Sequence, residues 1–75
     1  MSRKIIACNI RPDHNYKHSQ NVDFISETGY VTGVMHQDVK SANVVGDRIT
    51  IVCEGGKSLY IYDANTCQLL QVQPL

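Results

Sequence analysis

The stretch RITIVCEGGKSLYIYD, residues 48–63, decides the fold because it has the pattern of one antiparallel β-hairpin. Two runs rich in β-branched and aromatic residues, 48–54 and 57–63, flank a glycine pair, Gly55 and Gly56. Glycine readily adopts the positive φ angles that two-residue hairpin turns require. The sequence therefore predicts a turn at this pair, and the turn sets the pairing register of both strands.

This register places opposite charges across from each other, Arg48 with Asp63 and Glu54 with Lys57, an arrangement that cross-strand pairing favours. One face of the hairpin then carries four large apolar or aromatic residues: Ile49, Ile51, Tyr60 and Tyr62. The reverse face carries Thr50, Val52, Leu59 and Ile61. Both faces need cover, which a sandwich, a barrel or another chain would supply.

Further strands are predicted around the hairpin from apolar and β-branched runs, at residues 3–10, 30–35, 39–45 and 67–73. Gly46-Asp47 predicts a tight turn into the hairpin, and Asp63 is a favoured first residue for the turn after it. The chain is thus expected to be mainly β, a small antiparallel meander. The strands, about five or six in number, would form a sheet or a partly open barrel in one domain, residues 1–75.

Residues 13–29 are the hardest part of the chain to assign, because they begin with a long polar run. Ser19 and Gly29 have the chemistry of helix ends, which favours one short helix near 19–28 and an α+β fold as the alternative. Such a helix would turn Val22 and Ile25 inward. An ordered loop is the other interpretation of this segment.

Composition limits the classes of protein that fit. Net charge is zero and no apolar run approaches the roughly 20 residues of a membrane helix, so we expect no membrane span. The first apolar run is too short for a signal peptide, and three cysteines do not form a closed disulfide set. A cytoplasmic location with free thiols is therefore expected.

The segment 46–70, GDRITIVCEGGKSLYIYDANTCQLL, resembles a single blade repeat of the quinoprotein-type β-propellers. The run Tyr60-Ile61-Tyr62-Asp63, the turn that Asp63 opens and the pair Leu69-Leu70 stand where that repeat has them. Cys67 stands where the repeat has glycine. The resemblance implies a meander of strands and turns, and it carries no functional residue and no cofactor with it.

Cys8, His14 and His18 form the one metal-like cluster, because the H-x3-H step falls within zinc-ligand spacing. A small zinc-stabilised domain is therefore one alternative, with Cys53 or Cys67 as a further ligand. However, no close cysteine pair accompanies this cluster. Its cysteine also fits a core position on the strand 3–10, so no metal and no cofactor is favoured.

No pattern of catalytic residues stands out in the chain, and we expect no enzymatic activity. The run EGGKS at residues 54–58 resembles the end of a phosphate-binding P-loop. However, the first glycine of that motif would fall on Ile51, and a strand rather than a helix follows Lys57 and Ser58.

Two binding functions remain. The chain is expected to be a small non-enzymatic β-module that binds a protein partner or, more specifically, self-associates, with contacts through Ile49, Ile51, Tyr60 and Tyr62 or the reverse face of that hairpin. The alternative is single-stranded nucleic-acid binding by a basic N-terminal arm, since residues 1–18 hold four basic residues and one acid. The four are Arg3, Lys4, Arg11 and Lys17.

Overall fold

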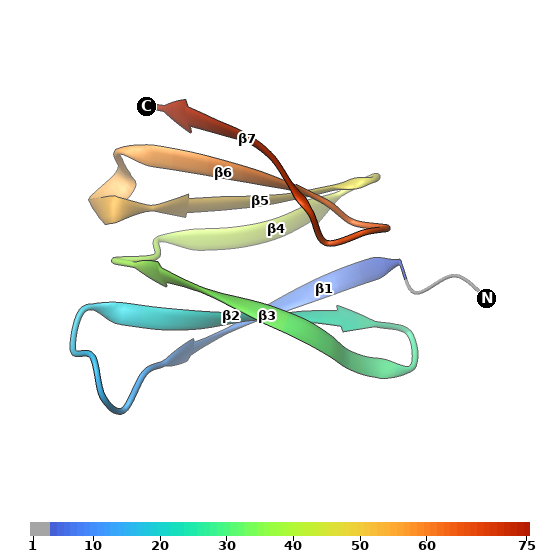
Figure 1. Cartoon of the computed structure of the whole chain (residues 1–75), viewed down its shortest axis with the longest axis horizontal. Coiled ribbons are helices and arrows are strands. Elements are labelled where there is room, and N and C mark those ends of the chain that lie inside the picture. The colour runs from blue at the N-terminus through green and yellow to red at the C-terminus, as the bar shows by residue number, and fades with distance from the viewer. Residues whose placement is uncertain (1–3) are drawn as a thin grey trace.

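The computed structural model describes residues 4–75, which form two antiparallel sheets (Figure 1). The first sheet has three strands in the order β1-β2-β3, with bounds Ile5–Pro12, Ser19–Ser26 and Gly29–Gln37. The second has four strands in the order β4-β5-β6-β7, with bounds Ser41–Val45, Arg48–Cys53, Ser58–Asp63 and Leu69–Pro74. A single 3-10 turn, η1 (Glu54–Gly56), joins β5 to β6.

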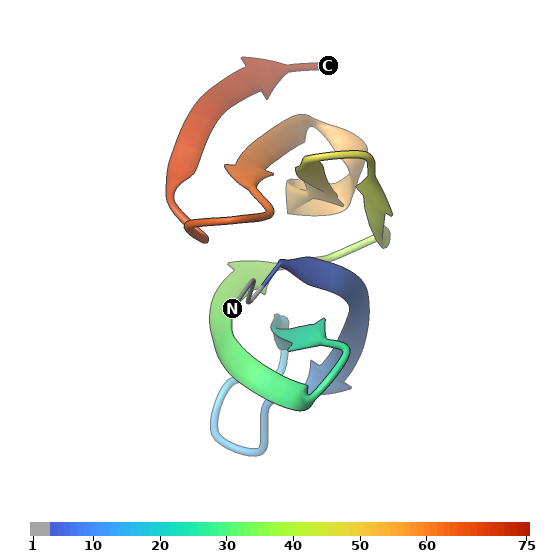
Figure 2. The same cartoon turned by 90° about the vertical axis from the view of Figure 1, so that its right-hand side faces the viewer.

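The expected mainly β antiparallel meander is confirmed, but its strands are divided between two sheets and close no barrel. Each sheet is strongly curled, and the two lie one above the other in Figure 2. The shortest extent of the backbone is 15 Å, so the molecule is thin. β1 lies against β4 at the boundary between the sheets, and the backbone N–H of Ile5 donates to the carbonyl of Ala64 at 2.8 Å.

The predicted hairpin register is confirmed at every pair of β5 with β6, from Arg48 opposite Asp63 to Val52 opposite Leu59. The turn itself is wider than predicted, because Glu54 joins the glycines in η1. The turn after β6 also forms as predicted: the Asp63 carboxylate accepts from the backbone N–H groups of Asn65 and Thr66 at 2.7 and 3.1 Å.

The expectation of a short helix near 19–28 was wrong, because Ser19–Ser26 is β2, the central strand of the first sheet. Val22 and Phe24 are one strand period apart and both are fully buried. A central strand satisfies its backbone on both sides, and that pairing overrides the weak end signals of a short helix. The residues before it form an ordered loop, in which Asp13 accepts from the backbone N–H of Asn15 at 2.7 Å.

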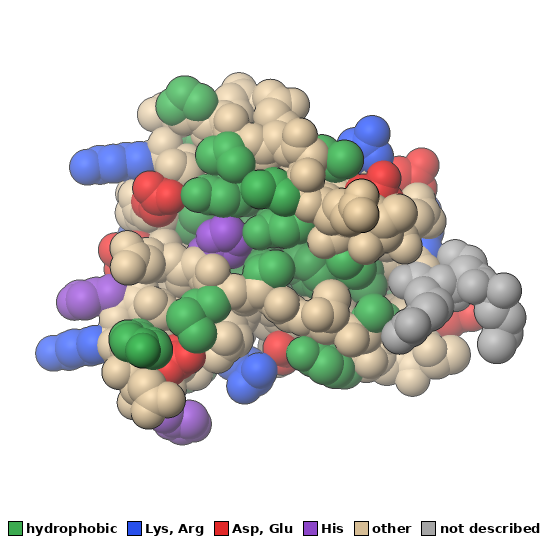
Figure 3. All heavy atoms as spheres, viewed as in Figure 1, with side chains coloured by type: hydrophobic (Ala, Val, Ile, Leu, Met, Phe, Trp, Pro, Cys, Tyr) green, Lys and Arg blue, Asp and Glu red, His purple; other side chains and the backbone are tan. Residues whose placement is uncertain are grey.

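The core lies between the two sheets. Its fully buried members come from both: Ile5, Val22 and Phe24 from the first sheet, and Ile49, Ile51, Cys53 and Ala64 from the second or the turn after β6. The rings of Phe24 and Tyr62 meet edge to face across the boundary, with centroids 5.4 Å apart. Figure 3 shows hydrophobic side chains gathered along this boundary on one face of the molecule.

Candidate functional site: the cleft between the sheets and the edge strand β7

The four residues expected at an interface lie mainly in the core of the chain itself. Ile49 and Ile51 are fully buried and Tyr62 nearly so, while Tyr60 is half-buried. The first sheet thus supplies the cover that this hairpin face requires. On the reverse face, Val52, Leu59 and Ile61 are half-buried and lie outside the core cluster.

The structure does not gather the predicted zinc ligands. Within residues 4–75, no three side chains of His, Cys, Asp or Glu lie close enough to hold a metal ion, so Cys8, His14 and His18 form no such group. Burial, together with the nearby Cys67, raises the pKa of Cys8 to about 11. This side chain is therefore mainly a protonated thiol at neutral pH, the form that is the weaker nucleophile.

The basic residues assigned to an anion-binding arm are spread along β1 and the loop after it. Lys4 forms an ion pair with Asp47 at 3.1 Å, and Arg11 is paired with Asp23. Lys17 lies in the exposed loop between β1 and β2. Arg3 lies outside the described residues. Two of the four basic residues, Lys4 and Arg11, are thus already paired with acids of the same chain.

The pair of Arg11 and Asp23 joins β1 to β2 by two hydrogen bonds. The guanidinium donates to the carboxylate through Nε at 2.7 Å and through Nη2 at 3.0 Å. These bonds hold the pKa of Asp23 below its usual value, although burial acts in the opposite direction. A carboxyl whose pKa is lower in the folded state stabilises the fold above the unfolded pKa of aspartate, about 4, and loses that contribution as the pH falls further.

We therefore expect Asp23→Asn to flatten the acid side of the stability profile. Below about pH 4 the free energy of unfolding of the variant should fall less steeply than that of the wild type. Urea titrations followed by far-UV circular dichroism at a series of pH values measure this slope. Glu27→Gln, at an exposed position in the β2–β3 turn, is the matched control. Equal slopes for wild type and Asp23→Asn would contradict the assignment.

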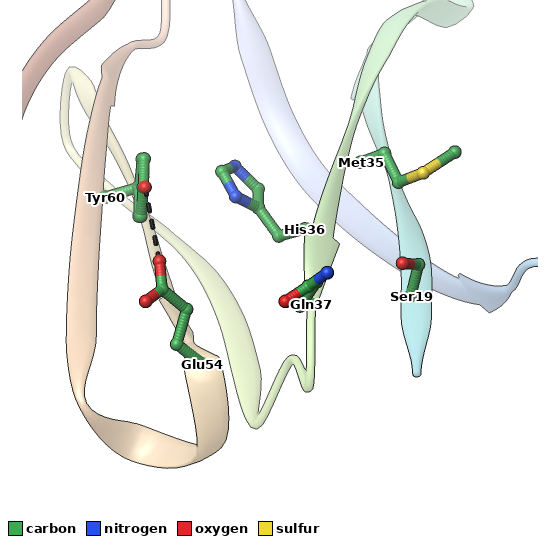
Figure 4. Close-up of a pocket in the computed structure, with 6 residues that line it drawn as sticks. All are labelled: Ser19, Met35, His36, Gln37, Glu54 and Tyr60. Atoms are coloured by element: carbon green, nitrogen blue, oxygen red, sulfur yellow. Dashed lines mark hydrogen bonds between the residues drawn. The ribbon is translucent and has the colours of Figure 1, made fainter. Parts of the chain in front are cut away.

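A cleft of about 340 Å³ opens between the two sheets (Figure 4). Its lining comes from β2, β3, η1 and β6: Ser19, Met35, His36, Gln37, Glu54 and Tyr60. His36 extends from β3 toward Tyr60, and the two ring centroids are 4.4 Å apart. The Tyr60 hydroxyl donates to the Glu54 carboxylate at 3.3 Å.

His36 also bonds to the core, since its Nε2 lies 2.8 Å from the Tyr62 hydroxyl. Burial lowers the pKa of this histidine, with Glu54 acting against the shift, so the ring is neutral at pH 7. Burial likewise raises the pKa of both Tyr60 and Tyr62, which stay protonated. The cleft therefore holds two neutral rings and one carboxylate. Sequence reasoning did not find it, because its residues come from segments far apart in the chain.

The second unusual surface is β7, an edge strand whose six residues are all exposed. Leu69, Leu70 and Val72 are each 48% exposed, and the adjoining Leu75 is 62% exposed. The strand is held by its ladder to β6, and no residue of Leu69–Pro74 carries a charge. An uncharged apolar edge of this kind is the usual site for pairing with another strand.

Comparison with protein-family models, with curated proteins and with solved structures finds no match for this chain. The resemblance of residues 46–70 to a propeller blade therefore stays a prediction. Within the described part of the chain, no helix has the length and apolar character needed to cross a bilayer.

Proposed function

We propose that this protein is a non-enzymatic β-module that acts by self-association, with β7 of one copy pairing to β7 of a second. The observation that carries the proposal is the exposure of every residue of this uncharged edge strand. Covering a bare apolar edge lowers the free energy of the protein in water. A second copy of the same strand can cover it without charge repulsion, because neither strand carries a charge.

The backbone geometry supports a specific register for this pairing. The N–H of Leu75 donates to the carbonyl of Lys57 at 2.9 Å, which fixes the alternation of bonded pairs along β6 and β7. Val72 and Pro74 then turn their backbone groups away from β6, toward the open edge. Pro74 has no N–H to offer there, so a symmetric antiparallel pair centred on Val72 makes the best use of the edge.

The other edges of the sheets are less suited to this role. β4, the opposite edge of the second sheet, lies against β1. β1 carries the charged Arg11, and charges on an edge strand discourage pairing with another strand. β3, the remaining edge, has four exposed residues of nine, whereas all six residues of β7 are exposed, so β7 is the edge that best fits a second copy.

Val72→Pro is the decisive variant, because it removes a backbone N–H that faces the open edge and leaves in place every N–H that bonds to β6. It also changes the side chain and fixes φ. Two symmetric bonds would be lost from the dimer, at about 1 kcal/mol each, which raises the dimer Kd about thirtyfold. Native mass spectrometry and light scattering of the untagged protein measure the change. Over a dilution series, we expect the dimer of the variant to dissociate at a concentration about thirtyfold higher than the dimer of the wild type.

Val72→Ala is the matched control, since it shortens the side chain and keeps the N–H. It should weaken the dimer less than Val72→Pro does. Circular dichroism should show both variants folded, because β7 keeps its bonds to β6. A wild-type monomer at about 100 µM, or a folded Val72→Pro variant whose dimer Kd equals that of the wild type, would overturn the proposal.

A further inference from the structure

We propose that the cleft between β3 and β6 binds a guanidinium group on an aliphatic stem, such as an arginine side chain. The site is separate from the pairing edge of β7, and its test does not depend on self-association. Three features of the cleft point to this ligand: the charge of the lining, the two aromatic rings and the backbone groups at the edge of β3.

The charge of the cleft selects a cation. Among the described lining residues, Glu54 is the only one with a charged side chain at neutral pH. Its Oε1 accepts from the Tyr60 hydroxyl, and no cation of residues 4–75 lies within ion-pair distance of it. One carboxylate oxygen thus remains open to a ligand, and the neutral His36 adds no repulsion.

The walls of the cleft match both parts of such a ligand. The rings of Tyr60 and His36 stand 52° apart at 4.4 Å, and a cation near the face of a tyrosine ring is attracted by its quadrupole. Met35 is half-exposed, and its side chain points to the side of β3 opposite the His36 ring (Figure 4), where it offers a flexible apolar surface for an aliphatic stem that crosses the strand edge.

The backbone of β3 supplies further acceptors, which is why a guanidinium fits better than an ammonium. The N–H of Asp38 donates to the carbonyl of His18 at 2.8 Å, so these two residues form a hydrogen-bonded pair. Such pairs recur at every second residue of an antiparallel ladder, so the even-numbered residues of β3 bond to β2. The carbonyls of Met35 and Gln37 therefore face the open edge of β3. A guanidinium has five donors in one plane and can reach a carboxylate and such carbonyls together.

The turn between β5 and β6 sets the position of Glu54 beside the cleft. Its φ is +54°, in the left-handed region that favours glycine, and the residue after it is also left-handed. Tight turns between antiparallel strands use this conformation. The turn thus presents the one carboxylate among the described lining residues to the cleft.

The test is a titration of the ¹⁵N-labelled protein with L-arginine, followed by amide chemical shifts. L-citrulline, the neutral isostere of arginine, is the ligand control. We expect shifts at Glu54, Tyr60 and His36 with arginine and none with citrulline. Glu54→Gln should weaken arginine binding about tenfold or more, because the charge-assisted bond is lost. Glu27→Gln, at an exposed position outside the cleft, should leave binding unchanged.

A blocked Gly-Arg-Gly tripeptide identifies the source of the ligand group. Tighter binding of the tripeptide than of free arginine would assign the cleft to an arginine of a protein chain, and the reverse order would assign it to a small molecule. Either result supports the site. Absence of binding by both, equal binding of citrulline, or full binding by Glu54→Gln would overturn the proposal.

Discussion

Phe24→Ala is expected to leave most of the protein unfolded at 25 °C. Phe24 is fully buried on the central strand of the first sheet, and its ring meets Tyr62 of the second sheet. Truncation of a buried phenylalanine costs about 3–5 kcal/mol, and a domain of this size rarely has more than about 5 kcal/mol of stability. The same substitution also removes the aromatic contact that joins the two sheets.

Urea unfolding followed by circular dichroism tests this expectation. Phe24→Leu keeps most of the volume and should cost less than about 1.5 kcal/mol. Tyr30→Ala is the aromatic control, because that side chain is 66% exposed on the neighbouring strand β3 and its loss should change stability by about 0.5 kcal/mol or less. A urea unfolding curve of Phe24→Ala that superimposes on that of the wild type would show that this ring does not stabilise the packing of the two sheets.

The second large effect is a difference in stability between two variants at neighbouring positions of β5. Ile51→Asp should unfold the chain, whereas Val52→Asp should not. Ile51 is fully buried, whereas Val52 is half-buried on the opposite face and lies outside the core cluster. An aspartate at the first position would bury a carboxylate without a partner, which costs more than the stability of the domain. The second substitution should cost about 1–2 kcal/mol and leave the chain folded.

NMR spectra separate the two outcomes. The chemical-shift dispersion of the amide signals should be lost in Ile51→Asp and kept in Val52→Asp. Equal behaviour of the two variants would mean that the faces of β5 are not distinguished as the structure places them. Since Ile51→Asp should unfold the chain, it cannot report on assembly. Substitutions at Val72 serve that purpose, because the backbone of that residue faces the open edge of β7.

The sequence predicted those parts of the fold that depend on local chemistry. The pairing of Arg48 with Asp63 followed from a glycine turn and strand alternation, and the structure confirms it. β2 was missed because its first residues are polar and Ser19 has the chemistry of a helix cap. Only the strands on either side of it, β1 and β3, make an extended backbone favourable there.

The candidate surfaces were predicted less well, because they depend on how the two sheets meet. Tyr60 was placed correctly on one face with Ile51, but a sequence pattern cannot show which of the two is covered by the other sheet. To predict the cleft, one would have to know that His36 lies beside Tyr60. That contact exists only because β3 and β6 meet in the folded chain. The apolar residues of β7 were visible in the sequence, whereas their exposure was not.

The connectivity of the strands has a consequence for the order of folding. Every ladder joins strands that follow each other directly in the chain, so each sheet can form from contacts between near neighbours. The bond from Ile5 to Ala64 is different, because it closes only when both sheets exist. During synthesis the first sheet would emerge complete and would expose Val22 and Phe24 until β5 and β6 follow from the ribosome. Docking of the sheets, rather than formation of any hairpin, is then the step that ends this exposure.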